Sequence, residues 1–106
     1  MNKPMLQLAL DTYDLPSALT PLQRAAAQID IIEVGTILCL AEGMRAVTAI
    51  KSLFPDKVVL ADVRIAEAGS IISKMAVDAQ ADWVCVVSGA APSSFEVVLA
   101  EAQSRS

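Results

Sequence analysis

The regular alternation of short apolar runs with amphipathic segments is the feature that most constrains the fold of this sequence. Apolar runs at residues 5–11, 30–34, 57–62 and 82–88 are typical of buried strands, and each precedes a segment with apolar residues at helical spacing. Strands that alternate with helices through short connections form a parallel sheet, because each crossover returns the chain to the same end of the sheet. The sequence therefore predicts an α/β fold.

The helical segments are predicted at residues 15–29, 42–54 and 67–80 and from Pro92 onward. Pro21 falls within the first of them and leaves two possibilities. Either it interrupts this helix, or it is the first residue of a shorter helix that Thr20 caps, with Gln23 as the partner in a capping box.

Four strand–helix units in 106 residues predict one domain that spans residues 1–106. Two architectures accommodate such units. One is a small open doubly wound sheet, and the other is a (βα)4 half of a TIM (β/α)8 barrel, which in full typically needs about 250 residues. The periodicity of the sequence is compatible with both.

Composition and charge exclude several classes of protein. The chain is 55% hydrophobic, whereas disordered chains have low hydrophobicity. Its net charge of −4 argues against a nucleic-acid partner, and its apolar runs are too short to cross a membrane. The absence of histidine excludes Ser-His, Cys-His and histidine-based metal chemistry within these residues.

The apolar strands also carry both cysteines and the tryptophan. Cys39 and Cys85 lie in strand-like runs, which indicates buried thiols in a reducing compartment. No basic segment followed by an apolar core begins the sequence, so a cytoplasmic protein is expected. Trp83 is expected to pack in the core.

Carboxylates follow or end three of the four predicted strands, as Asp11, Glu33 and Asp62. In parallel α/β folds, ligands bind at the carboxyl ends of the strands. Asp11 taken alone is equally compatible with capping the next helix. Glu33 lies in an apolar run and would be costly to bury without a partner, which could be a neighbouring basic residue.

The densest charged cluster consists of Asp62, Arg64 and Glu67. Asp62 and Arg64 share a face if the strand continues, and Glu67 lies at helical spacing from Arg64. An ordinary ion pair between Arg64 and Glu67 at a helix start explains the spacing equally well. If the carboxylates instead converge, oxygen ligands without histidine or thiolate suit Mg²⁺.

Three segments together resemble the 3-keto-L-gulonate 6-phosphate decarboxylase family. They are Leu-Gln-Leu-Ala-Leu-Asp at 6–11, Asp-Ile-Ile-Glu-Val-Gly-Thr at 30–36 and Leu-Ala-Asp-Val-Arg-Ile-Ala-Glu-Ala-Gly at 60–69. This family belongs to the orotidine 5′-phosphate decarboxylase superfamily, together with hexulose-6-phosphate synthase. The resemblance covers the first half of the family's eight-stranded barrel and weakens beyond about residues 83–91. It therefore implies the (βα)4 half of a TIM (β/α)8 barrel.

The resemblance implies a Mg²⁺-dependent carboxy-lyase of L-ascorbate catabolism that acts on a sugar phosphate. Such an enzyme forms L-xylulose 5-phosphate and CO2 through an enediolate. By position, Asp11 would contact the substrate, and Glu33 and Asp62 would hold the metal. The family's catalytic D-x-K-x-x-D motif would fall on Asp62, Arg64 and Glu67, with the last acid reaching across the interface of a dimer.

Two positions depart from the family motif, since Arg64 stands in place of lysine and Glu67 in place of aspartate. Arginine presents a rigid fork instead of a compact ammonium. The longer glutamate moves its carboxylate by about 1 Å, and such a displacement can slow an enzyme on the order of 10²-fold.

The phosphate-binding loops of such barrels follow strands seven and eight, so we expect these 106 residues by themselves to be inactive. Two further hypotheses stay open beside the decarboxylase. One is a non-catalytic half-barrel that associates with itself, and the other is an aldolase of the hexulose-6-phosphate synthase type.

Overall fold

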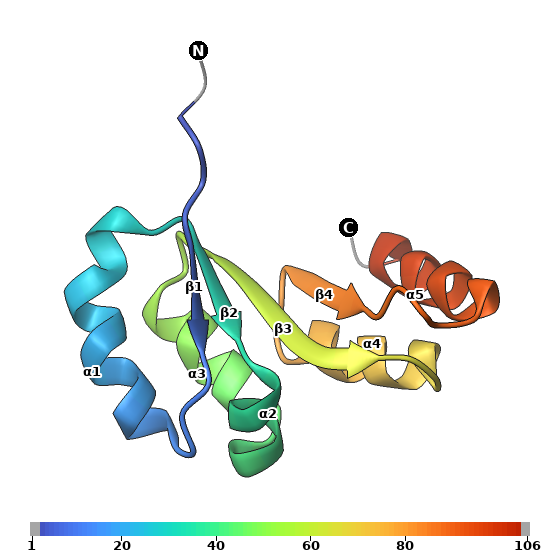
Figure 1. Ribbon diagram of the computed structural model, residues 1–106, viewed down its shortest axis with the longest axis horizontal. Coiled ribbons are helices and arrows are strands. Elements are labelled where there is room, and N and C mark those ends of the chain that lie inside the picture. Colours follow the sequence, from blue (N-terminus) through green and yellow to red (C-terminus); the bar gives the residue numbers. More distant parts are fainter. Residues whose placement is uncertain (1–2, 105–106) are drawn as a thin grey trace.

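The computed structural model describes residues 3–104, in which strands and helices alternate (Figure 1). The elements are β1 (Gln7–Leu10), α1 (Leu15–Ala25), a 3-10 turn η1 (Ala26–Gln28), β2 (Ile31–Val34), α2 (Thr36–Glu42), α3 (Arg45–Leu53), β3 (Val58–Ile65), α4 (Gly69–Asp78), β4 (Trp83–Val86) and α5 (Pro92–Ser104). Within this range no helix combines the length and apolarity needed to span a bilayer.

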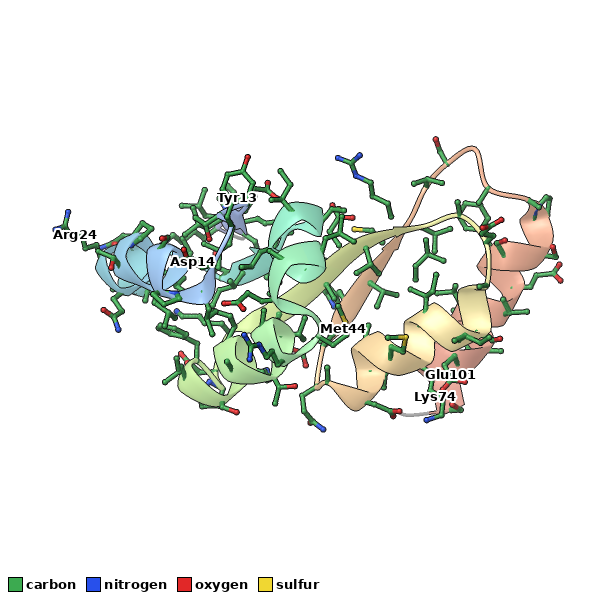
Figure 2. All side chains as sticks on the ribbon, turned by 90° about the horizontal axis from the view of Figure 1, so that it is seen from below. Tyr13, Asp14, Arg24, Met44, Lys74 and Glu101 are labelled. Atoms are coloured by element: carbon green, nitrogen blue, oxygen red, sulfur yellow. The ribbon has the colours of Figure 1, made fainter. Side chains whose placement is uncertain are left out.

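The four strands form one parallel sheet in the order β1-β2-β3-β4. The helices form an arc along one face of the curved sheet, and the opposite face is left open (Figure 2). A doubly wound sheet would carry helices on both faces. The structure is therefore the (βα)4 half-barrel that the sequence predicts.

The apolar core lies between the sheet and the helices. Alternate residues of a strand point to opposite faces, so Leu10 is buried under the helices while Gln7 and Ala9 lie exposed on the open face. In β2, Ile32 and Val34 enter the core and Glu33 does not. The open face is consequently the face on which polar side chains are placed.

The first helix runs through Pro21, and neither ends nor begins there. It begins at Leu15, where the Asp14 carboxylate caps it by accepting a 2.7 Å hydrogen bond from the Ser17 backbone N–H, and it continues to Ala25. Burial of Ala18 and Leu22 against the sheet holds the helix together across the proline. Packing therefore outweighs the backbone hydrogen bond that proline removes, and both predictions for Pro21 are wrong.

The segment after β2 forms two helices, whereas the sequence predicts a single helix over residues 42–54. Gly43 separates them, because its φ of 75° lies in a region that glycine adopts without strain. Its N–H donates to the Cys39 carbonyl and closes α2. The short α2 places Leu38 and Cys39 in the core, so Cys39 is buried as predicted, although on a helix and not on a strand.

The last strand is less buried than predicted. Trp83 is 46% exposed and Cys85 is half-buried, although the sequence places both in the core. The cause is that β4 is paired on one side only, with β3. A parallel strand that is apolar along its length needs neighbours on both sides to be covered.

Gly69, at the start of α4, lies against α5. A methyl group at this position would come within 2.9 Å of Val97 Cγ2 and 3.2 Å of the Ser94 carbonyl oxygen. Gly89, in the loop after β4, has no atom within 4 Å of the corresponding point. The two glycines therefore offer a matched pair for measuring how much this helix contact contributes.

We expect Gly69→Ala to lower the free energy of unfolding by about 1–3 kcal/mol, the usual cost of overpacking. Gly89→Ala should change it by no more than about 0.5 kcal/mol, as is usual at open surface positions. Urea unfolding followed by circular dichroism measures both. Equal effects of the two variants would show that the contact between α4 and α5 does not constrain the fold.

Candidate active site at the carboxyl ends of the strands

Asp11, Glu33 and Asp62 lie on the open face near the carboxyl ends of β1, β2 and β3. In the sheet register Glu33 is level with Ala9 of β1 and Leu60 of β3. Asp11 and Asp62 each follow these partners by two residues, which places them on the same face and nearer the strand ends. The structure therefore brings the three predicted carboxylates together.

Glu33 is half-buried, and its carboxylate accepts a 2.7 Å hydrogen bond from the Gln7 side-chain amide. Burial raises the pKa of Glu33, and the neighbouring Asp62 carboxyl raises it further by a shared hydrogen bond and by charge repulsion. The charge of Asp11 acts in the same direction, while the Gln7 hydrogen bond lowers the pKa of Glu33. Glu33 therefore sits in a locally negative environment.

Asp62 is held by contacts from two directions. The Thr36 hydroxyl, at the start of α2, donates a 2.8 Å hydrogen bond to the Asp62 carbonyl. The Arg64 backbone N–H donates a 3.2 Å hydrogen bond to the Asp62 carboxylate. The first contact ties the strand β3 to the neighbouring helix, and the second fixes the carboxylate relative to its own strand.

Gly35 permits the close approach of Asp11. A methyl group at Gly35 would overlap the Asp11 carboxylate and come within 2.7 Å of the Leu10 carbonyl. That carbonyl accepts a 2.9 Å hydrogen bond from the Gly35 N–H. Glycine is therefore required here so that the end of β1, with its acid, can lie directly against the start of α2.

The segment that carries Arg64 and Glu67 differs from the prediction. The strand β3 continues to Ile65, but its pairing with β4 shifts register between Ala61 and Ile65, and Arg64 has a left-handed φ of 49°. The regular alternation that would put Asp62 and Arg64 on one face is interrupted there. Both Arg64 and Glu67 are exposed.

Glu67 lies in the loop before α4, which begins at Gly69, whereas the sequence predicts a helix from residue 67. The spacing of Glu67 from Arg64 therefore does not align the two side chains along a helix face. Residues 3–104 contain no ion pair between Arg64 and Glu67. The prediction of an ordinary ion pair at a helix start is wrong.

Asp11 does not cap a helix, and Glu33 does not form an ion pair with a basic residue. The helix after β1 is capped by Asp14, not by Asp11. Glu33 has the Gln7 amide as its partner and forms no ion pair within residues 3–104. Neither acid is thus accounted for by a helix cap or by a basic neighbour.

Cys39 lies near the acidic cluster but takes no part in its chemistry. Burial raises the pKa of the Cys39 thiol to about 11, and the charges of Asp62 and Asp11 act in the same direction. The thiol therefore stays protonated at neutral pH and packs as an apolar side chain.

Two neighbouring carboxylates, one of which raises the pKa of the other, provide the oxygen donors that a hard cation such as Mg²⁺ prefers. Among residues 3–104, no group of three or more His, Cys, Asp or Glu side chains is arranged to hold a metal. Glu33 and Asp62 could therefore supply two ligands, and water or a bound substrate would have to supply the others.

Three residues that support the site were not predicted as functional: Gln7, Gly35 and Thr36. Gln7 could have been found, because strand alternation places it on the same face as Ala9 and Asp11. The roles of Gly35 and Thr36 depend on α2, a helix that the apolar periodicity of the sequence does not indicate.

Residues 4–106 match the family model of the orotidine 5′-phosphate decarboxylase / HUMPS family. The chain is 54% identical over 87 residues to 3-keto-L-gulonate-6-phosphate decarboxylase UlaD of Escherichia coli, a match that covers 82% of this chain and 40% of that protein. The chain thus spans less than half the length of this curated relative.

Solved structures of similar proteins share the fold closely. The decarboxylase of this type from Vibrio cholerae superposes with a TM-score of 0.94 at 36% identity, over 98% of this chain and 49% of that one. A 3-hexulose-6-phosphate synthase from Salmonella typhimurium superposes with a TM-score of 0.93 at 37% identity, over 96% and 48%. On the extent of these matches, the chain belongs to the orotidine 5′-phosphate decarboxylase / HUMPS family.

Proposed function

We propose that this chain supplies the acidic part of an active site that decarboxylates 3-keto-L-gulonate 6-phosphate to L-xylulose 5-phosphate and CO2. The observation that carries the proposal is the convergence of Asp11, Glu33 and Asp62 on the open face of the sheet. The 54% identity to a decarboxylase with this substrate in its name supports the choice of reaction. We also propose a cytoplasmic setting in L-ascorbate catabolism.

Loss of CO2 leaves an electron pair on the former carboxyl-bearing carbon, and the adjacent carbonyl accepts it to give an enediolate. A proton then returns to this carbon and forms the product. The transition state therefore develops negative charge on the substrate oxygens, and a site that stabilises this charge accelerates the reaction.

The acidic cluster fits a divalent cation on electrostatic grounds. Burial and the neighbouring carboxyl raise the pKa of Glu33, which means that ionising the whole cluster is unfavourable in the folded chain. A cation held by Glu33 and Asp62 would relieve this repulsion. Mg²⁺ bound there would supply Lewis-acid stabilisation of the enediolate.

The proposed roles of Asp11, Arg64 and Glu67 follow from where these residues lie in the fold. Asp11, at the end of β1, would accept hydrogen bonds from sugar hydroxyls. Arg64 would place a positive charge beside the developing enediolate, and its exposure leaves the guanidinium free to turn toward a substrate. Glu67, exposed in the loop before α4, would reach into the site of a second subunit in a dimer.

A second candidate is the aldol chemistry of 3-hexulose-6-phosphate synthase. It is favoured by the superposition on that enzyme with a TM-score of 0.93, nearly equal to that of the decarboxylase. Both reactions pass through a similar charge distribution on a sugar phosphate. The higher identity to the decarboxylase, 54%, makes decarboxylation the first choice.

We expect Glu33 to make the fold less stable as the pH rises. Its pKa is raised in the folded chain, so the folded state keeps this proton to higher pH than the unfolded state does. The free energy of unfolding should therefore fall as the pH rises from the ordinary value of 4.5 through the raised pKa. Glu33→Gln, measured by urea unfolding at a series of pH values, should remove this decrease.

The control for this measurement is Asp56→Asn, since Asp56 is exposed and precedes β3, at the opposite end of the strand from the carboxylates. A difference between Glu33→Gln and the unchanged chain that stays constant with pH would contradict the assigned repulsion.

Mg²⁺ should bind the unliganded chain only weakly, with a dissociation constant that is roughly millimolar or higher, because two carboxylates leave the ion mostly hydrated. Isothermal calorimetry should show weaker binding in Glu33→Gln and in Asp62→Asn and no change in Asp56→Asn. Tight binding that persists in both cluster variants would refute the assignment of Glu33 and Asp62 as ligands.

The role of the motif can be tested in a hybrid that joins residues 1–91 of this chain to the remaining segment of E. coli UlaD. We expect Arg64→Lys together with Glu67→Asp to raise its kcat/KM by roughly 10-fold or more, because a displacement of about 1 Å can cost on the order of 10²-fold. Release of CO2 from 3-keto-L-gulonate 6-phosphate is the readout.

The matched control is Arg24→Lys, the same exchange at an exposed position on α1 that the hybrid retains. It should leave kcat/KM unchanged. Synthesis of a hexulose 6-phosphate by the hybrid, without CO2 release, would select the aldolase instead. No gain from the double exchange in an otherwise active hybrid would remove Arg64 and Glu67 from the proposed mechanism.

A further inference from the structure

Both edge strands of the sheet are open along one side. The carbonyls of Leu6 and Leu10 accept hydrogen bonds from the backbone of β2 and the turn after it, at Ile31 and Gly35. Because successive residues of a strand direct their backbone groups to opposite sides, the N–H and C=O groups of Gln7 and Ala9 point away from β2. The strand β4 is likewise paired only with β3.

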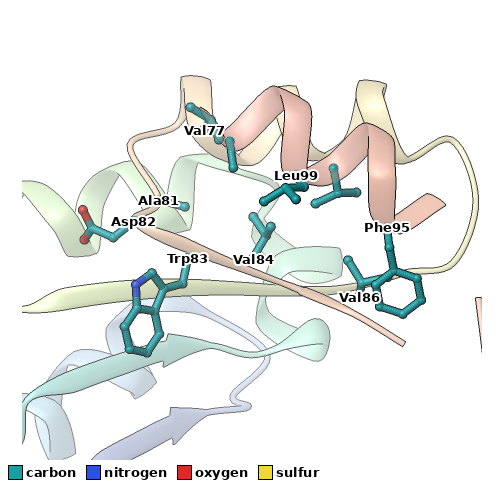
Figure 3. A pocket seen from close by; sticks show the side chains of 10 residues that line it. Val77, Ala81, Asp82, Trp83, Val84, Val86, Phe95 and Leu99 are labelled. Carbon is teal, nitrogen blue, oxygen red and sulfur yellow. The ribbon is translucent and has the colours of Figure 1, made fainter. Parts of the chain in front are cut away.

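An apolar cavity of about 430 Å³ lies beside the open edge of β4, between this strand and the helices α4 and α5. Figure 3 shows Val84 and Val86 of β4 directed toward Phe95 and Leu99 of α5. Leu99 is nevertheless 58% exposed, since α5 packs mainly against α4 and only slightly against β4. The apolar side of α5 thus overhangs a space next to the last strand.

We infer that a second copy of this chain fills this space and that its β1 pairs in parallel with β4. The side chains of β1 fit the cavity, because Leu8 and Leu10 lie on the helix-facing side of the strand and would come to lie beneath α5. Added in this way, β1 continues the pattern of parallel pairing already present from β1 through β4.

Pairing of β4 with β1 of the second copy would also close the sheet into a barrel. The described residues contain four strands, and the superposed relatives are about twice as long. Two copies related by a two-fold axis that coincides with the barrel axis would form two identical β4–β1 junctions and one eight-stranded barrel. A closed barrel has no open edges, and the inner face that is now exposed would be covered. This inference rests on the sheet edges and is independent of the proposed reaction.

Charge acts against this association. Each copy carries a net charge of −4, and closure brings the acidic clusters of both copies to the same mouth of the barrel. The experiment is therefore carried out at high ionic strength, where the Debye length is only about 3 Å at 1 M salt.

Trp83 is the only tryptophan and lies at the proposed junction, 46% exposed. Dilution of the 106-residue chain should shift its fluorescence to the red as the molecular mass by light scattering falls from twice 11.2 kDa to 11.2 kDa. A chain that stays at 11.2 kDa at every concentration, larger open-ended assemblies, or a dimer in which Trp83 fluoresces as in the monomer would each overturn the inference.

Ala9→Pro tests the pairing itself. Proline is tolerated in edge strands where its nitrogen faces away from the sheet, and it removes one free N–H at each of the two junctions. The dissociation constant should rise roughly tenfold or more, because each lost hydrogen bond contributes about 1 kcal/mol. Ala9→Val, which keeps the N–H, and Leu40→Lys, on the exposed side of α2, should leave it unchanged.

If Ala9→Pro lacks the circular dichroism of the unchanged chain, Leu99→Lys replaces it. This exposed position on α5 tolerates a lysine in the monomer but would place a charge over the incoming strand. Association that persists in Leu99→Lys, or that is abolished by Leu40→Lys, would show that the copies meet through another surface.

Discussion

Every feature of this structure depends on the one-sided cover of a parallel sheet. Each crossover returns through a helix on the same face, so the leucines, isoleucines and valines on that face of the strands are buried in the core. The helices α1, α3 and α4 are held by this face and not by their own sequences. Pro21 illustrates the point, since it lies within a helix that burial of Ala18 and Leu22 sustains.

The open face can hold charge because it takes no part in the core. Glu33 lies in the middle of an apolar strand, and on the helix-facing side its ionisation would be prohibitive. On the open face it is half-buried, receives one hydrogen bond from Gln7 and lies beside Asp62. The raised pKa of Glu33 is a measure of the free energy that the fold gives up to keep these carboxylates together, and such groupings are typical of functional sites.

The sequence predicts the features that depend on periodicity and not those that depend on single backbone conformations. Four strands, their parallel order and the convergence of Asp11, Glu33 and Asp62 follow from strand alternation and right-handed crossovers. The end of α2 at Gly43, before α3, and the irregularity at Arg64 each depend on a residue with positive φ. Periodicity carries no information about such positions.

The exposure of Trp83 has a different origin. Its strand has the composition of a fully buried strand, and the prediction that Trp83 packs in the core rests on that composition. The structure supplies a neighbour on one side only. The apolar pattern of a strand predicts that it is buried, but it does not predict how many neighbouring strands pair with it in the sheet.

The end of β3 and the loop that follows it contain two residues with unfavourable backbone conformations. Arg64 and Ala68 both have left-handed φ values, of 49° and 51°, and such residues other than glycine cost on the order of 1 kcal/mol each. They lie on either side of Glu67, in the segment to which the proposed mechanism assigns Arg64 and Glu67. Because the backbone at Arg64 sets the direction of its side chain, the exchange of lysine for arginine changes a group whose placement depends on a strained conformation. In the proposed mechanism, the consequence of that exchange therefore depends on the backbone of residues 62–68 as well as on the two side chains.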